Sequence, residues 1–255
     1  MTRRGYALAL AGALMLGALP ACATASPATL CDSQTLAVSG GAYTLQNNEY
    51  GSAARQCITT DGSTDFMVAT SSIADATRGV PGGYPSLYKG CHWGACTSGS
   101  GLPIRVSSIR AGTVTTSWRT SQPRGSNVYN VAYDIWFSKT PTATGQPNGG
   151  ELMIWLNHSG RVHPAGSLIA GSVSIGGRSY DVWGRVIGGR TISYAMTGAA
   201  TSVRNLDLQP LVADAVSRGY IRGSWYLIDV EAGFEIWQGG AGLGTRSFSV
   251  SVASP

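Results

Sequence analysis

Three segments of this chain alternate apolar and polar side chains with a period of two residues. They cover residues 128–137, 151–158 and 226–237. A helix would repeat its apolar residues every three to four positions, so each segment predicts a β-strand with one buried face. In the third segment the buried face is expected to hold Tyr226, Ile228, Val230, Ala232, Phe234 and Ile236. Clusters of glycine, proline and asparagine, as at 81–83 and 147–150, favour turns between strands. The pattern predicts an all-β fold of antiparallel sheet.

The composition agrees with a globular chain rich in turns. Of 255 residues, 43% are hydrophobic and 12% are charged, against about 25% charged in an ordinary domain. This composition excludes a disordered chain and a long charged coiled coil. Glycine is frequent, at 35 residues. The net charge of +5 is too small for a nucleic-acid-binding surface, so no nucleic-acid partner is expected.

One segment has a helical pattern instead. Apolar residues recur at helical spacing between residues 206 and 218, where Asp207 stands near the start and Gly219 provides a stop. No internal repeat, linker or second domain boundary is visible in the sequence. We therefore expect one β-sandwich with a single helix at about 206–218, in a single domain over residues 26–255.

The first 25 residues have the features of a secretory signal peptide. Arg3 and Arg4 give a positively charged start, and the apolar run at 7–19 is shorter than the ~20 residues that a membrane-spanning helix needs. An Ala-x-Ala cleavage site at 23–25 would leave Ser26 first. We expect a secreted, extracellular protein with no membrane attachment after the signal peptide is removed.

A lipoprotein is the alternative for this N-terminus. Residues 19–22 loosely resemble a lipobox that ends in Cys22, although Pro20 fits that motif poorly. Free secretion is therefore the favoured prediction.

The four cysteines beyond the leader predict two disulfides. They are Cys31, Cys57, Cys91 and Cys96, an even number that allows three connectivities in a secreted chain. The five-residue spacing favours a small Cys91–Cys96 loop, which leaves Cys31 to pair with Cys57. A zinc site built from Cys91, Cys96 and His92 is the alternative. Adjacent ligands in a secreted chain argue against it, so no metal is expected.

Acidic residues stand beside large side chains on the polar faces of the three alternating segments. Asp134 lies next to Trp136 on its face, Glu151 next to Met153 and Trp155, and Glu235 next to Trp237. The apolar faces of sugar rings stack on aromatic side chains, and a glycosidic bond is cleaved by two carboxyl groups. The pattern indicates a carbohydrate cleft on the sheet, with an ordinary solvated strand face as the alternative.

Several motifs resemble glycoside hydrolase family 12. They are residues 84–96, 98–103, 129–137, 150–158 and 230–243, which occur in the family's order and cover essentially the whole chain from Cys31 to Val252. The resemblance implies a β-jelly-roll sandwich of two antiparallel sheets with a substrate cleft on the concave face. It also implies an endo-β-1,4-glucanase that hydrolyses a β-glucan polysaccharide with retention of configuration. We expect a monomer that needs no cofactor.

The resemblance assigns roles to residues that match the family's motifs. Glu151 is the expected nucleophile, Glu235 the general acid/base, and Asp134 an acidic neighbour that hydrogen-bonds the nucleophile. Six further residues resemble the family's substrate-binding positions, although less specifically than the catalytic residues do. They are Asn48, Tyr50, His92, Trp93, Met153 and Trp155. A turn, packing around the cysteine loop or plain strand core would also explain these six residues. Glu231 is interpreted as a hydrogen-bonding neighbour outside the catalytic pair.

Three positions depart from the family's pattern. Gly184 and Gly189 stand where close relatives have a tyrosine and a tryptophan, and Tyr180 replaces another tryptophan. Fewer aromatics around the cleft would loosen glucose subsites or admit branched chains, so cellulose, mixed-linkage β-glucan and xyloglucan are all open as substrates. A family 11 xylanase and a non-catalytic carbohydrate-binding jelly roll are further alternatives. The paired glutamates Glu151 and Glu235 argue against the second of these.

Overall fold

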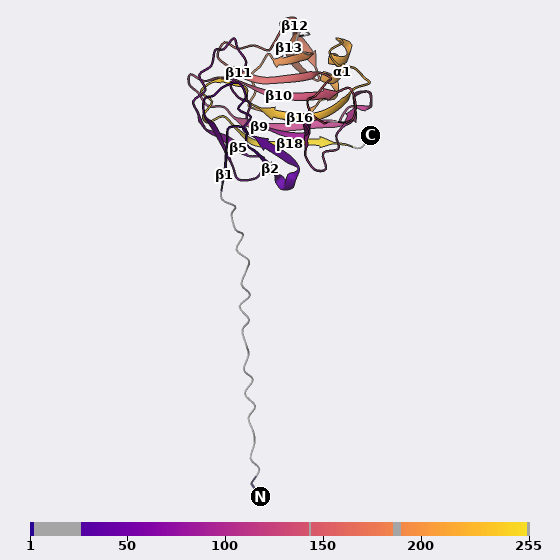
Figure 1. Ribbon diagram of the computed structural model, residues 1–255. Helices are drawn as coiled ribbons and strands as arrows, with labels where there is room; N and C mark the ends of the chain where they lie inside the picture. The colour runs from indigo at the N-terminus through magenta and orange to yellow at the C-terminus, as the bar shows by residue number, and fades with distance from the viewer. Residues whose placement is uncertain (3–26, 143, 186–189, 254–255) are drawn as a thin grey trace.

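The computed structural model describes residues 1–2, 27–142, 144–185 and 190–253, and Figure 1 shows these parts as stacked β-sheet with one short α-helix beside it. The expected signal peptide beyond residue 2, its cleavage site, Cys22, Ser26 and Gly189 lie outside the described residues. No helix in the described ranges is long and apolar enough to cross a membrane.

Two sheets make up the fold. The six-stranded sheet contains, in spatial order, β1 (Ala28–Cys31), β4 (Gln56–Thr60), β5 (Phe66–Ser71), β18 (Gly244–Val252), β9 (Val114–Ser121) and β15 (Ser202–Asp207). The 12-stranded sheet follows the order β12 (Ser167–Ile175), β13 (Arg178–Arg185), β14 (Thr191–Met196), β11 (Glu151–Ser159), β10 (Val128–Ser138), β16 (Tyr226–Gly233), β6 (Ser86–His92), β3 (Tyr43–Gln46) and β2 (Thr35–Val38). Its short side strands are β17 (Ile236–Gln238), β7 (Ala95–Cys96) and β8 (Ile104–Arg105). Two 3-10 turns, Ser39–Gly41 and Val106–Ser108, complete the described elements with the helix α1 (Gln209–Ser217).

The main hydrophobic core contains the apolar faces that the alternation predicts. Strand β10 contributes Tyr129, Val131, Tyr133, Ile135 and Phe137, and β11 contributes Leu152, Ile154 and Leu156, all buried. Trp118 on β9 belongs to the same core, where its ring meets Tyr133 edge-on at 5.1 Å. Its indole Nε1 donates a hydrogen bond to Thr245 Oγ1 at 3.0 Å. With one face of β10 and β11 in this core, their polar side chains lie on the opposite face.

The predicted face of β16 is wrong at its first residues. Asp229 pairs with Trp136 and Leu227 with Phe137, so Ile228 is an extra residue in a β-bulge. Leu227 consequently joins the main core in the place expected for Ile228. The alternation recovers after the bulge, which leaves Asp229 and Glu231 on the face away from the core.

The helix is shorter than predicted. Helix α1 covers Gln209–Ser217, whereas Leu206 and Asp207 belong to β15 and pair with Thr116 and Thr115 of β9. Pairing with an existing strand is favoured over an extra helical turn at these positions. The expectation for Asp207 near the helix start is confirmed, because its Oδ1 accepts a hydrogen bond from the Gln209 backbone N–H at 3.0 Å.

One strand pair is parallel, although antiparallel sheet was predicted throughout. Strands β11 and β14 run in the same direction, with Glu151 opposite Thr191 and Met153 opposite Ser193. The hairpin of β12 and β13 lies between them in the sequence and supplies the crossover that a parallel pair requires. This register brings the first residue of β14 beside the first residue of β11.

Both predicted disulfides are present. Cys31–Cys57 links directly opposed residues of β1 and β4. Cys91–Cys96 closes the hairpin of β6 and β7, whose tip carries His92, Trp93 and Gly94. The second disulfide fixes a short segment beside the polar face of the 12-stranded sheet.

Candidate active site

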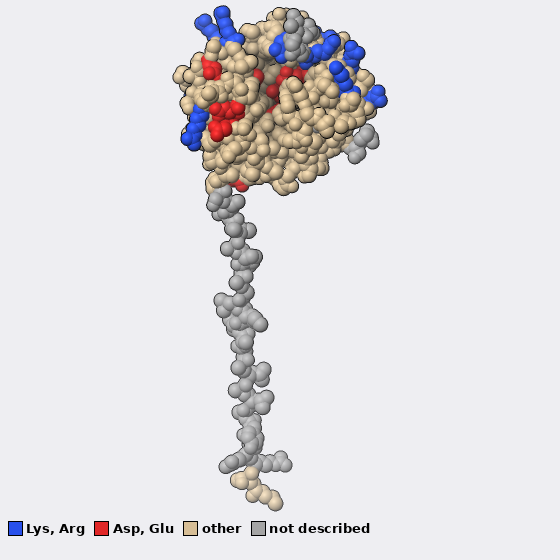
Figure 2. Space-filling model, in the orientation of Figure 1, with Lys and Arg blue, Asp and Glu red and all other residues tan. Residues whose placement is uncertain are grey.

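A cavity of about 570 Å³ opens on the face of the 12-stranded sheet that is turned away from the main core. Its lining residues are Gln46, Asn48, Tyr50, Tyr84, His92, Trp93, Asp134, Trp136, Glu151, Glu231 and Glu235. Figure 2 shows a hollow in the surface with acidic atoms inside it, and basic side chains on the surface to both sides of its upper end. The carboxylates predicted to be catalytic therefore share one cavity.

Glu151 begins β11 and lies between two neighbouring strands. It is opposite Trp136 on β10 and Thr191 on β14, and its Oε2 accepts a hydrogen bond from Thr191 Oγ1 at 2.9 Å. Burial raises the pKa of Glu151 to about 7, while the Thr191 hydroxyl and the charge of Arg185 oppose that rise. The hydroxyl thus favours the ionised form of this carboxyl group.

Glu235 stands between β16 and β17 and is held by Asn130 of β10. The Glu235 backbone N–H donates to Asn130 Oδ1 at 3.0 Å, and Asn130 Nδ2 donates to Glu235 Oε2. Burial and then the charge of Glu151 raise the pKa of Glu235 to about 8, against the lowering effect of Asn130. The charge of Glu151 thus favours the protonated form of Glu235.

Asp134 is buried and lies directly opposite Glu231 of β16. Burial, with the charges of Glu151, Glu235 and Glu231, raises its pKa well above the usual range. Its Oδ1 has no hydrogen-bond partner. The expected hydrogen bond from Asp134 to Glu151 is not formed within the described part of the chain.

Four of the six predicted substrate-binding residues line the cavity, namely Asn48, Tyr50, His92 and Trp93. Tyr50 and Trp93 are 54% and 45% exposed, which leaves two aromatic faces open to a ligand. Trp93 also meets Trp136 edge-on at 5.1 Å. The arrangement offers flat apolar surfaces beside buried carboxyl groups.

Met153 and Trp155 share the face of Glu151 but do not line the cavity. They are 5% and 2% exposed and form a second buried cluster with Ala132, Val162 and Trp237. Val162, from the segment that follows β11, packs in this cluster and shields the two side chains from solvent. These two side chains therefore support the sheet face and are not open to a ligand.

Comparison with known proteins identifies the family. Residues 41–253 match the sequence pattern of glycosyl hydrolase family 12. The chain belongs to this family.

Solved structures of family 12 enzymes share its fold. A metagenome-derived family 12 endoglucanase is 42% identical with a TM-score of 0.84, over 90% of this chain and 99% of that one. Endoglucanase Cel12A from Rhodothermus marinus is 43% identical with a TM-score of 0.83, over 89% and 99%. A family 12 xyloglucanase from Bacillus licheniformis is 29% identical with a TM-score of 0.78, over 89% and 100%. The prediction of a β-jelly-roll glycoside hydrolase is confirmed.

A further relative is named as a cellulase. The probable cellulase Cel12b of Mycobacterium tuberculosis is 36% identical over 157 residues, which is 60% of this chain and 99% of that protein.

The family 12 cavity contains residues that the sequence interpretation did not assign to it. Gln46 and Tyr84 line it, and Asn130 and Thr191 bind the two glutamates. Asn130 lies on the polar face of the segment 128–137, beside the predicted Asp134 and Trp136, so the alternation could have found it. Thr191 gave no signal, because its position depends on a parallel strand pair formed across 40 residues of sequence.

Two of the departures from the family's pattern lie away from the cavity. Tyr180 is fully buried in the main core, 6.0 Å from the ring of Tyr194. A Cβ atom at Gly184 would come within 2.0 Å of Tyr220 Oη, so this position is filled by Tyr220. The expectation that these two positions loosen the cleft of this family 12 enzyme is therefore wrong.

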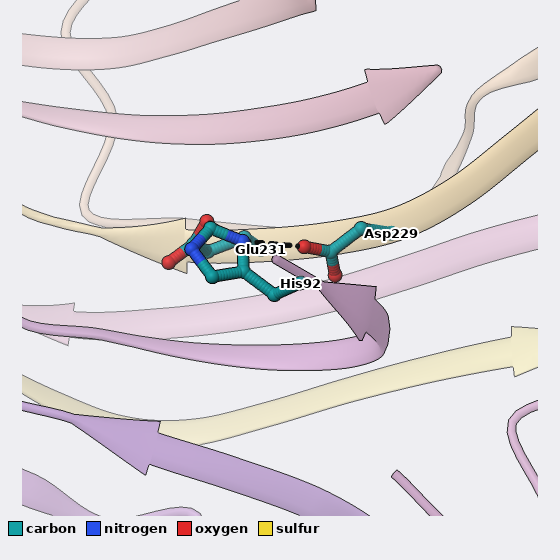
Figure 3. A group of neighbouring side chains, drawn as sticks. All are labelled: His92, Asp229 and Glu231. Atoms are coloured by element: carbon teal, nitrogen blue, oxygen red, sulfur yellow. Dashed lines mark hydrogen bonds and ion pairs between the residues drawn. The ribbon is translucent and has the colours of Figure 1, made fainter. Parts of the chain in front are cut away.

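A cluster of His92, Asp229 and Glu231 adjoins the cavity (Figure 3). His92 Nδ1 lies 2.9 Å from Asp229 Oδ2 and 3.4 Å from Glu231 Oε2. Burial by itself lowers the pKa of His92, but Glu231 and Asp229 raise it to about 9. One atom from each residue lies within 4.8 Å of the others, and all three residue types can bind metals. The 2.9 Å separation between His92 Nδ1 and Asp229 Oδ2 is that of a hydrogen bond.

Proposed function

We propose that this glycoside hydrolase is a secreted endo-β-1,4-glucanase that cleaves internal bonds of cellulose or a related β-glucan with retention of configuration. The observation that carries the proposal is the pair Glu151 and Glu235 in one cavity. The Thr191 hydroxyl favours the ionised form of Glu151, while burial and the charge of Glu151 raise the pKa of Glu235. A retaining glycosidase needs one protonated and one ionised carboxyl group at the start of its reaction.

The reaction follows as two displacements. In the first, Glu151 attacks the anomeric carbon while Glu235 gives its proton to the departing glycosidic oxygen, so a glycosyl ester forms and the first sugar product leaves. In the second, Glu235 takes a proton from water, the water oxygen attacks the anomeric carbon, and the ester bond to Glu151 breaks. Two inversions at one carbon give net retention.

Asp134 assists the nucleophile in this scheme. Burial and the neighbouring carboxylates raise its pKa, which favours a neutral acid. The structure has no hydrogen bond between Asp134 and Glu151, so the proposal is that Asp134 donates one only when substrate is bound. We expect Asp134→Asn to fold normally and to reduce turnover by less than Glu151→Ala does. Full activity with an unchanged pH profile would exclude Asp134 from the reaction.

The substrate is inferred from the cavity and from relatives. Tyr50 and Trp93 offer open aromatic faces for glucose rings, and Asn48 offers a polar contact. Among the solved structures, the metagenome-derived endoglucanase and Cel12A from Rhodothermus marinus are 42% and 43% identical to this chain, against 29% for the Bacillus licheniformis xyloglucanase, so an unbranched β-glucan is the first choice. Reducing-sugar release from carboxymethylcellulose, mixed-linkage β-glucan, xyloglucan and xylan ranks the candidates directly.

Two variants test the catalytic pair. Glu151→Ala cannot form the glycosyl ester, so turnover of every substrate should stop. Glu235→Ala lacks the proton donor, so an aryl glycoside with a good leaving group should still complete its first step. Azide should then give a β-glycosyl azide with Glu235→Ala and an α-glycosyl azide with Glu151→Ala. Proton NMR of the first product of the unaltered enzyme should show the β-anomer, and an α-anomer would refute the mechanism.

Secretion is proposed from the leader and the disulfides. The two disulfides fit an oxidising compartment, and the leader sequence at 1–25 fits export. Intact-mass analysis of the exported protein should give a chain that begins at Ser26 and gains the mass of four hydrogen atoms when the two disulfides are reduced. A lipid on Cys22 or four free thiols would contradict this processing.

A further inference from the structure

Several segments that carry exposed basic side chains meet around Gly150 and Glu151. The Glu151 backbone N–H donates to the Arg190 carbonyl oxygen at 2.8 Å, and the Gly150 carbonyl oxygen accepts from the Phe137 N–H at 2.9 Å. A Cβ atom at Gly150 would lie 3.3 Å from the backbone oxygen of Tyr220. The exposed basic residues of these segments, which we call the basic edge, are Lys139, Arg185, Arg190 and Arg222. Basic side chains beside the hollow are visible in Figure 2.

The register of the sheet puts Arg185 on the same face as Glu151. Arg185 ends β13 opposite Thr191 of β14, and Thr191 is opposite Glu151 of β11. Directly opposed residues of neighbouring strands share a face, and the strands are about 4.8 Å apart. The backbone of Arg185 therefore lies about 10 Å beyond that of Glu151 on the cavity side of the sheet. This distance is within the length of a short oligosaccharide that extends out of the cavity.

The charges of the basic edge are not neutralised by carboxylates. Among the described residues, none of its four members forms an ion pair. Arg190 donates from Nη1 to the carbonyl oxygen of Gly219 at 2.8 Å, which leaves its charge uncompensated. The acid nearby, Asp214, is already paired with Arg218 at 2.6 Å. A guanidinium binds a carboxylate through two parallel hydrogen bonds, so the basic edge suits the carboxylate groups of a ligand.

The cavity beside the basic edge is acidic. It is lined by Asp134, Glu151, Glu231 and Glu235, and a carboxylate on a sugar ring inside it would be repelled at close range. Rings inside the cavity must therefore be neutral. Rings further along the same chain can carry carboxylates where they pass Arg185. The two charged regions together select where the carboxylates of a bound glucan lie.

We propose that the basic edge binds carboxylate groups on the part of the glucan that extends past Glu151, so that the preferred substrate is a β-glucan carrying carboxylates at intervals. This inference rests on the proposed function and names the chemical class of its substrate. Arg185 is the residue that determines this specificity, because the register places it on the cavity side.

The test compares two soluble cellulose derivatives of matched chain length and degree of substitution. Carboxymethylcellulose carries carboxylates, whereas hydroxyethylcellulose is neutral. The ratio of kcat/KM on the first to kcat/KM on the second should exceed one at low salt and fall as salt is added. Arg185→Gln should lower this ratio about two- to fivefold, as expected for one exposed ion pair. The ratio cancels any effect of Arg185 on the pKa of Glu151, because the same carboxylate attacks both substrates.

Matched variants separate local binding from the overall charge of the protein. Arg185→Lys keeps the positive charge and should keep the ratio above one, and Arg185→Gln/Arg222→Gln should lower it further than Arg185→Gln. Arg119→Gln makes the same substitution at an exposed arginine on β9 of the other sheet and should leave the ratio unchanged. A ratio of one or less in the unaltered enzyme would overturn the proposal, as would an equal fall in Arg185→Gln and Arg119→Gln.

Product analysis provides a second readout. Mass spectrometry of the products from carboxymethylcellulose should find carboxymethyl groups enriched at a fixed distance from the new chain end, and Arg185→Gln should remove this enrichment. Enrichment that persists in Arg185→Gln would refute the role of Arg185. An enzyme that cleaves neither derivative would refute the proposed function instead. In that case, retardation of the protein by carboxymethylcellulose in affinity electrophoresis, weakened in Arg185→Gln, would still support the basic edge.

Discussion

The hydrogen bond from Thr191 to Glu151 can be removed without changing the shape of the site. Thr191→Val replaces the hydroxyl by a methyl group of similar size, so Glu151 Oε2 loses its donor at 2.9 Å. Thr191 is only 3% exposed, which limits replacement of that donor by bulk water. The substitution therefore acts on the proton affinity of Glu151.

The size of the effect follows from the strength of the bond. A hydrogen bond to a charged group contributes about 1.5–3 kcal/mol, and about 1.4 kcal/mol corresponds to one pKa unit. Because the bond stabilises the ionised form, its loss should raise the pKa of Glu151 by about one to two units. Glu151 must be ionised to attack, so the acidic limb of kcat/KM should move to higher pH by that amount.

The assay is the pH profile of kcat/KM on a soluble β-glucan, measured beside two controls. Thr191→Ser keeps the hydroxyl and should retain the acidic limb of the unaltered enzyme. Ser193→Ala changes a buried hydroxyl two residues further along β14 whose oxygen has no partner, so it should also leave the limb in place. An unmoved limb in Thr191→Val, with the fold intact, would refute the claim that Thr191 tunes Glu151.

Three further changes have defined outcomes. Asn130→Ala removes a bond that lowers the pKa of Glu235, so the alkaline limb of kcat/KM should move up by about one unit. Replacing Cys31 and Cys57 by serine should lower the free energy of unfolding by about 3 kcal/mol in urea titrations, since the bridge spans 26 residues; an unchanged midpoint would contradict this. Gly184→Ala should lower the free energy of unfolding by about 1–3 kcal/mol, because the new Cβ clashes with Tyr220. The double variant Gly184→Ala/Tyr220→Ala should have the same melting temperature as Tyr220→Ala, since the clash is then absent.

Local patterns in the sequence predicted the strands because each strand buries one face. The alternation in 128–137 identified the core residues of β10 and the carboxylate Asp134 on its other face. The bulge at Ile228 could not be predicted, because a bulge depends on the register with the partner strand β10, which is distant in the sequence. The helix boundary failed for a similar reason, because Leu206 pairs with a strand that is distant in sequence.

Site residues could be predicted where the side chain is reactive and the alternation places it on the polar face of a strand. The acidic residues beside tryptophans met that condition. The supporting groups did not, because Thr191 and Gln46 are ordinary strand residues until the sheet order brings them to Glu151 and Glu231. Met153 and Trp155 show the opposite error, since they share the correct face but are covered by other side chains.

The crowding of carboxyl groups in one cavity ties the working conditions of this enzyme to its durability. Glu151, Asp229 and Glu235 have pKa values of about 7, 7 and 8 in the fold, against ordinary values near 4 in an unfolded chain. Between about pH 4 and pH 8 the folded state therefore binds more protons than the unfolded state, so the free energy of unfolding falls as the pH rises. Glu151 must lose its proton before it can attack, and loss of that proton lowers the free energy of unfolding. A preparation should consequently survive heating longest at a pH below the one at which it turns over fastest, and storage and use call for different buffers.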